Sequence, residues 1–168
     1  MDGKTALLLT PLVSSTCTVL FAFDQHSFLE PFTRRACYRR SNDLLPSYMK
    51  IFSPRCLAQV MSFLGVTTWS SAAALYACRA LLRAKGSTRW YGAAAAMACA
   101  HLLYVPLVAS KARAIMDDDG VAVEDEGSTN ADILCSWLKV NVARTVTTDL
   151  VGWVCAFVAV GKTFSPAI

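Results

Sequence analysis

Two groups of polar side chains in otherwise apolar stretches have the residue types and spacing that acid–base chemistry requires. In the first, His101 lies in the segment AMACAHLLYVPLVA, and Tyr104 follows it on the same face of a helix. Imidazole titrates near neutral pH and burial tunes it, so His101 is a candidate general base. Pro106 is expected to kink this helix beside a cavity. The alternative is a neutral, buried His101 that hydrogen-bonds to a neighbouring helix.

The second group follows a 4-3-4 spacing and consists of Trp137, Asn141, Arg144 and Thr148. At 100° per residue these side chains fall within about 60° of one another, so they form one stripe on a helix. Indole, amide and guanidinium groups can hold a flat, oxygen-rich ligand by stacking and by donating hydrogen bonds. The alternative is a polar seam that joins helices. Asp149 lies roughly 140° around an α-helix from Arg144, so we do not expect these two to pair.

A carboxylate, Asp24, ends the first apolar stretch of the chain. We expect it either to pair with Arg144 or to orient His101, and the alternative is a simple interfacial cap. Asp24, His26 and His101 show no recognisable metal-ligand spacing, so the sequence predicts no metal site.

The elements that must position these residues belong to a membrane protein by composition. Of 168 residues, 55% are apolar or aromatic and only 17% are charged. Soluble domains carry about 25% charged residues, so this chain cannot cover a globular surface in the usual way. The composition excludes an ordinary soluble enzyme, a disordered protein and a nucleic-acid binder. Residues 1–168 are expected to form a single integral membrane domain.

Four stretches are expected to cross the bilayer as helices, because about 20 apolar residues span it and every backbone amide must be bonded internally. They cover residues 5–27, 56–80, 90–110 and 133–161. The fourth carries Lys139, Arg144 and Asp149; charged groups this deep in hydrocarbon usually face a bundle interior or a wet cavity. With short connections, the predicted fold is an all-α, antiparallel four-helix transmembrane bundle.

The remaining segments are predicted to support this bundle. Asp43–Pro54 is apolar but contains two prolines, so we expect an interfacial segment, or a lid, between spans 1 and 2. The acidic stretch Asp117–Glu126 is expected to be a solvated connector; as a calcium loop it would have Ile115 at the first ligand position. The seven cysteines form no CxxC pair and are expected to behave as small hydrophobes.

Four stretches carry a family resemblance: the first span running into FAFDQHSFLEPF, LLPSYMKIFSP at Leu44–Pro54, HLLYVPLVA at His101–Ala109, and WLKVNVARTVTTDLVGW at Trp137–Trp153. In this order they resemble the fungal anthrone oxygenase family, small four-span membrane proteins of polyketide clusters. Trp137, Asn141 and Arg144 match the family's pattern.

The resemblance implies oxidation of an anthrone to an anthraquinone by molecular oxygen, without flavin, haem or a required metal. Removing one proton from the anthrone methylene gives an electron-rich anion that reacts with oxygen directly. On this hypothesis His101 is the base, Arg144 and Asn141 donate to the substrate oxygens, and Asp24 orients His101 or binds Arg144. The substrate-binding residues would be Trp69, Tyr104, Trp137 and Thr148.

Two other functions fit the same residues. A membrane cyclase or isomerase acting on a related substrate would use the same acid–base groups without consuming oxygen. A non-catalytic scaffold would instead tether the enzymes of a pathway at the membrane. The expected partners are a small apolar aromatic substrate and the lipid bilayer, with a second protomer or other pathway enzymes as further candidates and no nucleic acid. We expect a multi-pass protein of an endomembrane such as the endoplasmic reticulum.

Overall fold

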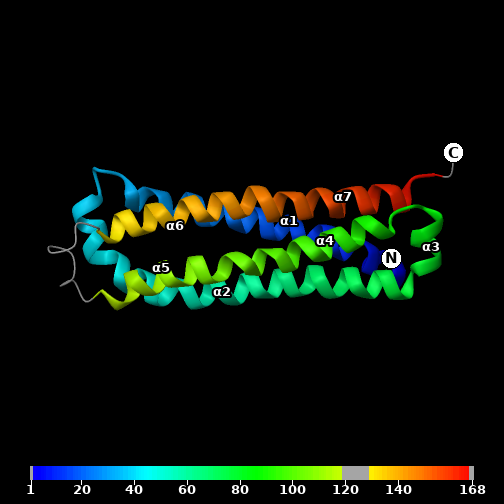
Figure 1. The fold of residues 1–168 in the computed structure, drawn as a ribbon, viewed down its shortest axis with the longest axis horizontal. Coiled ribbons are helices and arrows are strands. Elements are labelled where there is room, and N and C mark those ends of the chain that lie inside the picture. The colour runs from blue at the N-terminus through cyan, green and yellow to red at the C-terminus, as the bar shows by residue number, and fades with distance from the viewer. Residues whose placement is uncertain (1, 119–128, 167–168) are drawn as a thin grey trace.

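The computed structural model describes residues 2–118 and 129–166. Within these ranges the regular structure is entirely helical, and four long helical segments lie side by side (Figure 1). They are α1 (Gly3–Leu29) with the short turn η1 (Glu30–Thr33); α2 (Tyr38–Ala77); α4 (Thr88–His101), η2 (Leu102–Tyr104) and α5 (Val105–Asp117); and α6 (Asn130–Arg144), η3 (Thr145–Asp149) and α7 (Leu150–Phe164). The short helix α3 (Arg79–Ala84) joins α2 to α4. Most of the predicted acidic connector, residues 119–128, lies outside the described residues.

The four segments run alternately in opposite directions, so both termini lie at the same end of the bundle (Figure 1). α1 packs against α2 and α7, and α4 packs against the same two helices, which closes a ring of four. At the other end α5 packs against α2 and α6. The predicted all-α class is confirmed for the described residues.

Three of the four segments are long and apolar enough to cross a membrane: Gly3–Thr33, Thr88–Asp117 and Asn130–Phe164. The outer surface carries large apolar side chains, including Phe23, Leu103 and Phe157, as expected where lipid replaces water. The predicted span 56–80 lies largely in α2, which is not among the three. Its polar side chains, such as Gln59 and Thr67, lower its hydropathy. These features indicate a membrane protein.

The expected separate segment at Asp43–Pro54 is instead part of α2, which runs through both Pro46 and Pro54. Leu45 and Met49 lie one turn apart and are buried in the core between α2, α5 and α6. Burial of this apolar stripe holds the segment against the bundle as a helix, which the sequence prediction did not anticipate.

Helix α2 tolerates Pro46 because a side chain replaces the lost backbone hydrogen bond. Proline at 46 has no N–H to donate to the carbonyl of Asn42. The Nδ2 of Asn130 donates to that carbonyl instead, at 3.3 Å. In return, the Oδ1 of Asn42 accepts a hydrogen bond from the backbone N–H of Ala131 at 3.0 Å. These two hydrogen bonds of Asn42 therefore join the first half of α2 to the start of α6.

A second contact joins the beginnings of these two helices. The side chain of Thr129 accepts from the backbone N–H of Asp132, and Asp132 accepts from the backbone of Thr129, which together form a capping box. The Tyr38 hydroxyl donates to the Oδ2 of Asp132 at 2.6 Å, which joins the start of α2 to the start of α6.

A glycine sets the distance between α7 and α4. A Cβ atom added at Gly152 would lie 3.1 Å from the Cβ of Met97. We expect Gly152→Ala to lower the free energy of unfolding by about 1–3 kcal/mol, because α4 must move away to make room. The matched variant Gly65→Ala meets nothing within 4 Å and should unfold at or above the wild-type midpoint, because alanine favours a helix more than glycine does. The measurement is the thermal midpoint of the purified protein in detergent, and equal midpoints for the two variants would contradict the prediction.

Candidate functional site

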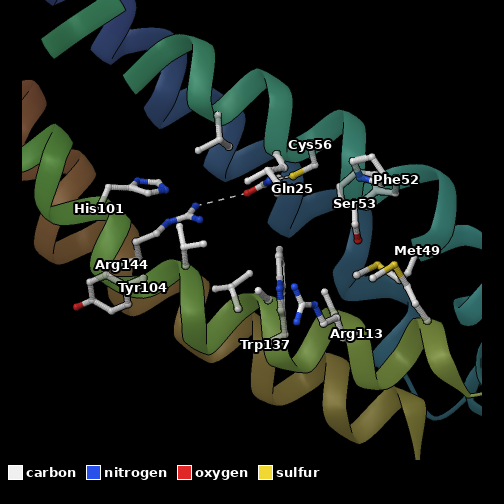
Figure 2. A pocket seen from close by; sticks show the side chains of 18 residues that line it. Gln25, Met49, Phe52, Ser53, Cys56, His101, Tyr104, Arg113, Trp137 and Arg144 are labelled. Atoms are coloured by element: carbon white, nitrogen blue, oxygen red, sulfur yellow. Dashed lines mark hydrogen bonds between the residues drawn. The ribbon is translucent and has the colours of Figure 1, made fainter. Parts of the chain in front are cut away.

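A cavity of about 320 Å³ opens between α2 and the η2–α5 segment (Figure 2). Pockets that bind small molecules have volumes of roughly 300 Å³ or more, so this cavity has room for one compact ligand. Its walls are mostly apolar and include Phe52, Leu57, Val60, Val105 and Val108. Several polar lining groups come from α1, α2, α4, η2 and α6: Gln25, Cys56, His101, Tyr104 and Arg144.

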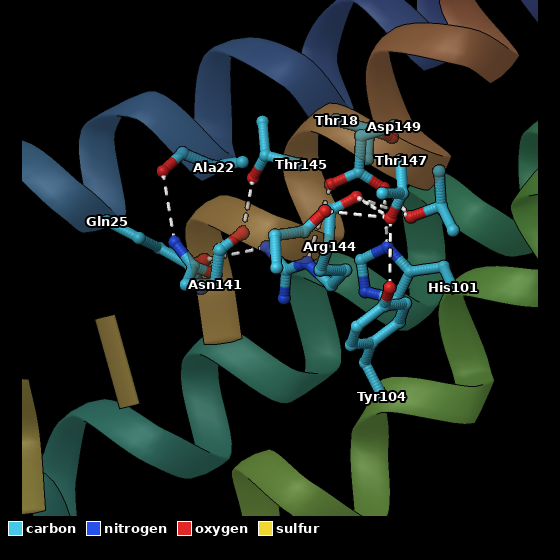
Figure 3. A network of polar contacts seen from close by, with 12 residues as sticks. Thr18, Ala22, Gln25, His101, Tyr104, Asn141, Arg144, Thr145, Thr147 and Asp149 are labelled. Carbon is cyan, nitrogen blue, oxygen red and sulfur yellow. Dashed lines mark hydrogen bonds and ion pairs between the residues drawn. The ribbon is translucent and has the colours of Figure 1, made fainter. Parts of the chain in front are cut away.

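An imidazole–carboxylate pair involves one of these polar groups. The Nδ1 of His101 is 2.6 Å from the Oδ1 of Asp149 (Figure 3). His101 is 2% exposed and Asp149 is 6% exposed, so bulk water does not compete for this contact. An ionised carboxylate only accepts hydrogen bonds, so Nδ1 carries the proton of this contact, and in the neutral imidazole Nε2 then has a lone pair. Since His101 lines the cavity, this arrangement can accept a proton from a bound ligand.

Arg144 holds the other side of the same carboxylate. Its Nε lies 3.4 Å from the Oδ2 of Asp149, and its Nη2 donates to the Oε1 of Gln25 at 3.4 Å. The Nε–H does not point along the line to Oδ2, so the Asp149 contact is an ion pair rather than a hydrogen bond. The Thr148 hydroxyl adds a 3.3 Å contact to Oδ1. His101, Asp149 and Arg144 thus form one buried network.

The prediction that Arg144 and Asp149 cannot pair is wrong, because the helix is not α-helical between them. Thr145–Asp149 form one π-helical turn, in which the rotation per residue is smaller and residues five apart share a face. Threonine hydroxyls donate further hydrogen bonds to backbone carbonyls beside this turn. Thr145 donates to the carbonyl of Asn141 at 2.8 Å, and Thr148 donates to that of Arg144 at 2.7 Å.

The remaining predicted residues of the α6 stripe divide between the cavity and the helix contacts. Trp137 lines the cavity, is 3% exposed, and has an Nε1–H with no partner among the described residues. Asn141 is buried, but its Nδ2 approaches the carbonyl of Ala22 at 3.5 Å, which places it between α6 and α1 rather than on the cavity wall. Thr148 lines a separate hollow of about 20 Å³ behind Asp149.

Tyr104 lines the cavity, and its hydroxyl lies 2.9 Å from the Oγ1 of Thr147. This contact joins η2 to the π-helical turn, so it helps to fix His101 opposite Asp149.

Two residues predicted for the site lie elsewhere in the structure. Asp24 is exposed on α1, and Trp69 is 77% exposed on the outer face of α2. The contact expected of Asp24 with Arg144 is made by its neighbour Gln25, which also donates to the Sγ of Cys56. Within the described ranges, no group of three or more metal-binding side chains is placed to hold an ion.

Residues that the sequence did not single out complete the cavity. Gln25 and Cys56 line it from α1 and α2, and Arg113 lines it from α5. Gln25 carries a signal that was available, because it is a polar residue at the end of an apolar span. Arg113 looks like an ordinary interfacial cation in the sequence, and only the packing of α5 against α2 and α6 brings it to the cavity.

Comparison with known proteins gives one relative. The chain is 27% identical over 156 residues to the protein named "Probable epoxidase scpX" from Mollisia scopiformis, and the match covers 93% of this chain and 94% of that protein. This similarity over nearly the whole length is consistent with the resemblance to the anthrone oxygenase family. No family model matches the chain. No solved structure matches it either.

Proposed function

We propose that the protein is a multi-pass membrane oxygenase that removes a proton from a flat, electron-rich aromatic substrate, whose carbanion then reacts with molecular oxygen. The observation that carries the proposal is the buried His101–Asp149 pair, with the imidazole facing a mostly apolar cavity. The name of the relative, a probable epoxidase, supports an oxygenase-type role.

The proposal places α2 in the bilayer as a fourth span. α2 packs against α1 and α4, two segments that belong to the membrane-crossing candidates. Its outward face carries Trp69 and Tyr76, and both side chains are strongly exposed. A helix enclosed by spans on one side and presenting aromatic rings on the other is suited to lipid. An endomembrane such as the endoplasmic reticulum remains the proposed location.

The proposed chemistry starts from an acidic methylene group that lies opposite a carbonyl and is conjugated to it through aromatic rings, as in an anthrone. The Nε2 of His101 takes one methylene proton, and the negative charge spreads to the carbonyl oxygen, where Arg144 and the Nε1–H of Trp137 are available donors. Oxygen adds to the carbanion and the imidazolium returns its proton, which gives a hydroperoxide. Loss of water then leaves a new carbonyl group, so CH₂ and O₂ become C=O and H₂O. The substrate supplies all the electrons, and no organic cofactor enters the proposal.

Epoxidation is a second candidate, favoured by the name of the relative. The same base would deprotonate a hydroquinone, oxygen would add to the ring, and the hydroperoxide would close to an epoxide with loss of water. A hydroquinone and O₂ then become a quinone epoxide and H₂O, again with electrons from the substrate alone.

Oxygen uptake by membranes that contain this chain alone tests the proposal. Emodin anthrone would be supplied under ¹⁸O₂, in conditions that suppress its spontaneous oxidation, with membranes lacking the protein as the control. We expect protein-dependent uptake with one ¹⁸O atom in the quinone. A panel of hydroquinones would test for labelled epoxides. Conversion without oxygen uptake would favour a cyclase or isomerase, and no conversion of either class would favour a scaffold.

The two tryptophans predicted for substrate binding should behave differently. Trp137→Ala removes a buried cavity wall, and we expect KM to rise by up to about tenfold, since an aromatic pair contributes about 0.5–1.5 kcal/mol and about 1.4 kcal/mol corresponds to a factor of ten. Trp69→Ala removes a ring that faces outward and should leave KM unchanged. The assay is the initial rate of oxygen uptake against substrate concentration. An effect of Trp69→Ala as large as that of Trp137→Ala would contradict this assignment of the cavity.

A further inference from the structure

The charges that line the cavity are of one sign. Arg144 and Arg113 both line it, together with the titratable imidazole of His101, and none of the described lining residues is acidic. Asp149 balances Arg144 from outside the cavity wall. The positive charge of Arg113 therefore faces a mostly apolar space into which no acidic lining residue projects.

Arg113 lies at the opposite end of the cavity from the proposed base. From residue 101 to residue 113 the chain advances 12 residues, or about 18 Å of helix axis. Two contacts fix the register of this segment, one against η3 and one against α6: Tyr104 with Thr147 at 2.9 Å, and Lys111 with Ser136 at 2.8 Å. Figure 2 shows Arg113 next to Trp137, on the side away from His101.

A donor lies between the two ends. The Nε1–H of Trp137 is buried and has no partner among the described residues, and the ring lines the cavity. A buried donor without a partner is costly, so a ligand that offers it an oxygen acceptor gains affinity. The cavity is thus lined by the imidazole of His101 at one end, by the indole of Trp137 in the middle and by the guanidinium of Arg113 at the other end.

We propose that the substrate is an aromatic carboxylic acid, bound with its carboxylate on Arg113 and its reacting carbon at His101. This assignment rests on the proposed function and names its substrate class. The planar guanidinium matches a carboxylate with two parallel hydrogen bonds, and the apolar walls take the ring system. An oxygen substituent on the ring accepts from Trp137.

The test compares two probes of similar shape, anthraquinone-2-carboxylate and 2-methylanthraquinone. Their dissociation constants are measured by tryptophan fluorescence quenching of the purified protein in a neutral detergent. We expect the wild type to bind the carboxylate about fivefold more tightly, the size expected for a partly solvated ion pair. Arg113→Gln should abolish this preference without changing the affinity for the methyl compound. Lys139→Gln removes a positive charge from an exposed side chain that does not line the cavity, and it should keep the preference.

Each outcome decides between this inference and the function on which it rests. A wild type that binds both probes equally, or an Arg113→Gln variant that keeps the preference, would overturn the assignment of the carboxylate while leaving the aromatic cavity in place. If neither probe binds, both the substrate class and the aromatic cavity are wrong. Arg113→Lys keeps the charge and should retain part of the preference, which separates charge from folding effects.

Discussion

Replacing His101 with alanine is expected to lower turnover by about 10²–10⁴-fold, the range that a positioned general base contributes. The variant loses the imidazole that lines the cavity, but the pairing of Arg144 with Asp149 stays in place. The protein should therefore still insert into the membrane and fold. The measurement is the rate of protein-dependent oxygen uptake, normalised to the amount of folded protein in the membrane.

The chain offers a matched control, since it has only two histidines. His26 lies on α1 and is not among the residues that line the cavity. His26→Ala should turn over like the wild type. Wild-type turnover in His101→Ala would mean that another group removes the proton.

Arg144→Met should lower the free energy of unfolding by more than Gly152→Ala does. It leaves the carboxylate of Asp149 buried without its guanidinium, and breaking a buried ion pair in this way costs about 3–5 kcal/mol. Adding Asp149→Asn removes the stranded charge, so the double variant should recover much of the lost stability. Thermal unfolding in detergent of the wild type, both single variants and the double variant gives the coupling energy between the two sites.

Additive effects of the two substitutions would contradict this account of the ion pair. Both Arg144→Met and the double variant should be slow in oxygen uptake. The double variant would then be stable yet inactive, because Arg144 is a donor to the substrate oxygen in the proposed reaction and Asp149 orients His101. Recovery of stability and activity together would show that the network only supports the fold.

The helices could be predicted from the sequence because uncharged runs of sufficient length have few alternatives in a bilayer. The sequence did not predict that α2 continues as one helix through Pro46 and Pro54. The partner that replaces the lost hydrogen bond of Pro46 is Asn130, 84 positions further along the chain, and only the assembled bundle brings it close. Local sequence rules favour a break at proline, and tertiary contacts override them here.

The candidate site was predictable in part. The spacing of Trp137 and Arg144 predicted a shared side of one helix, and both residues line the cavity, as do His101 and Tyr104 from the facing segment. Asp149 was missed as the partner of His101 because the prediction assumed α-helical rotation through a turn that is π-helical.

Asp24 and Gln25 show the limit of reasoning from residue type. Adjacent residues on a helix point about 100° apart, so one of them faces the bundle and the other faces out. The charge of Asp24 made it the more attractive candidate, yet Gln25 is buried and bonded to Arg144. The packing of α1 against α6 decides between them, and the sequence carries no direct record of it.

The central claim is that the reaction begins with proton removal by His101, and hydrogen exchange under anaerobic conditions tests it most directly. Emodin anthrone in D₂O, without oxygen, would be followed by NMR at its methylene carbon in the presence of membranes with the wild type or His101→Ala. The account predicts that the wild type accelerates exchange above background and that His101→Ala does not. Wild-type membranes that consume oxygen but do not accelerate exchange would contradict it.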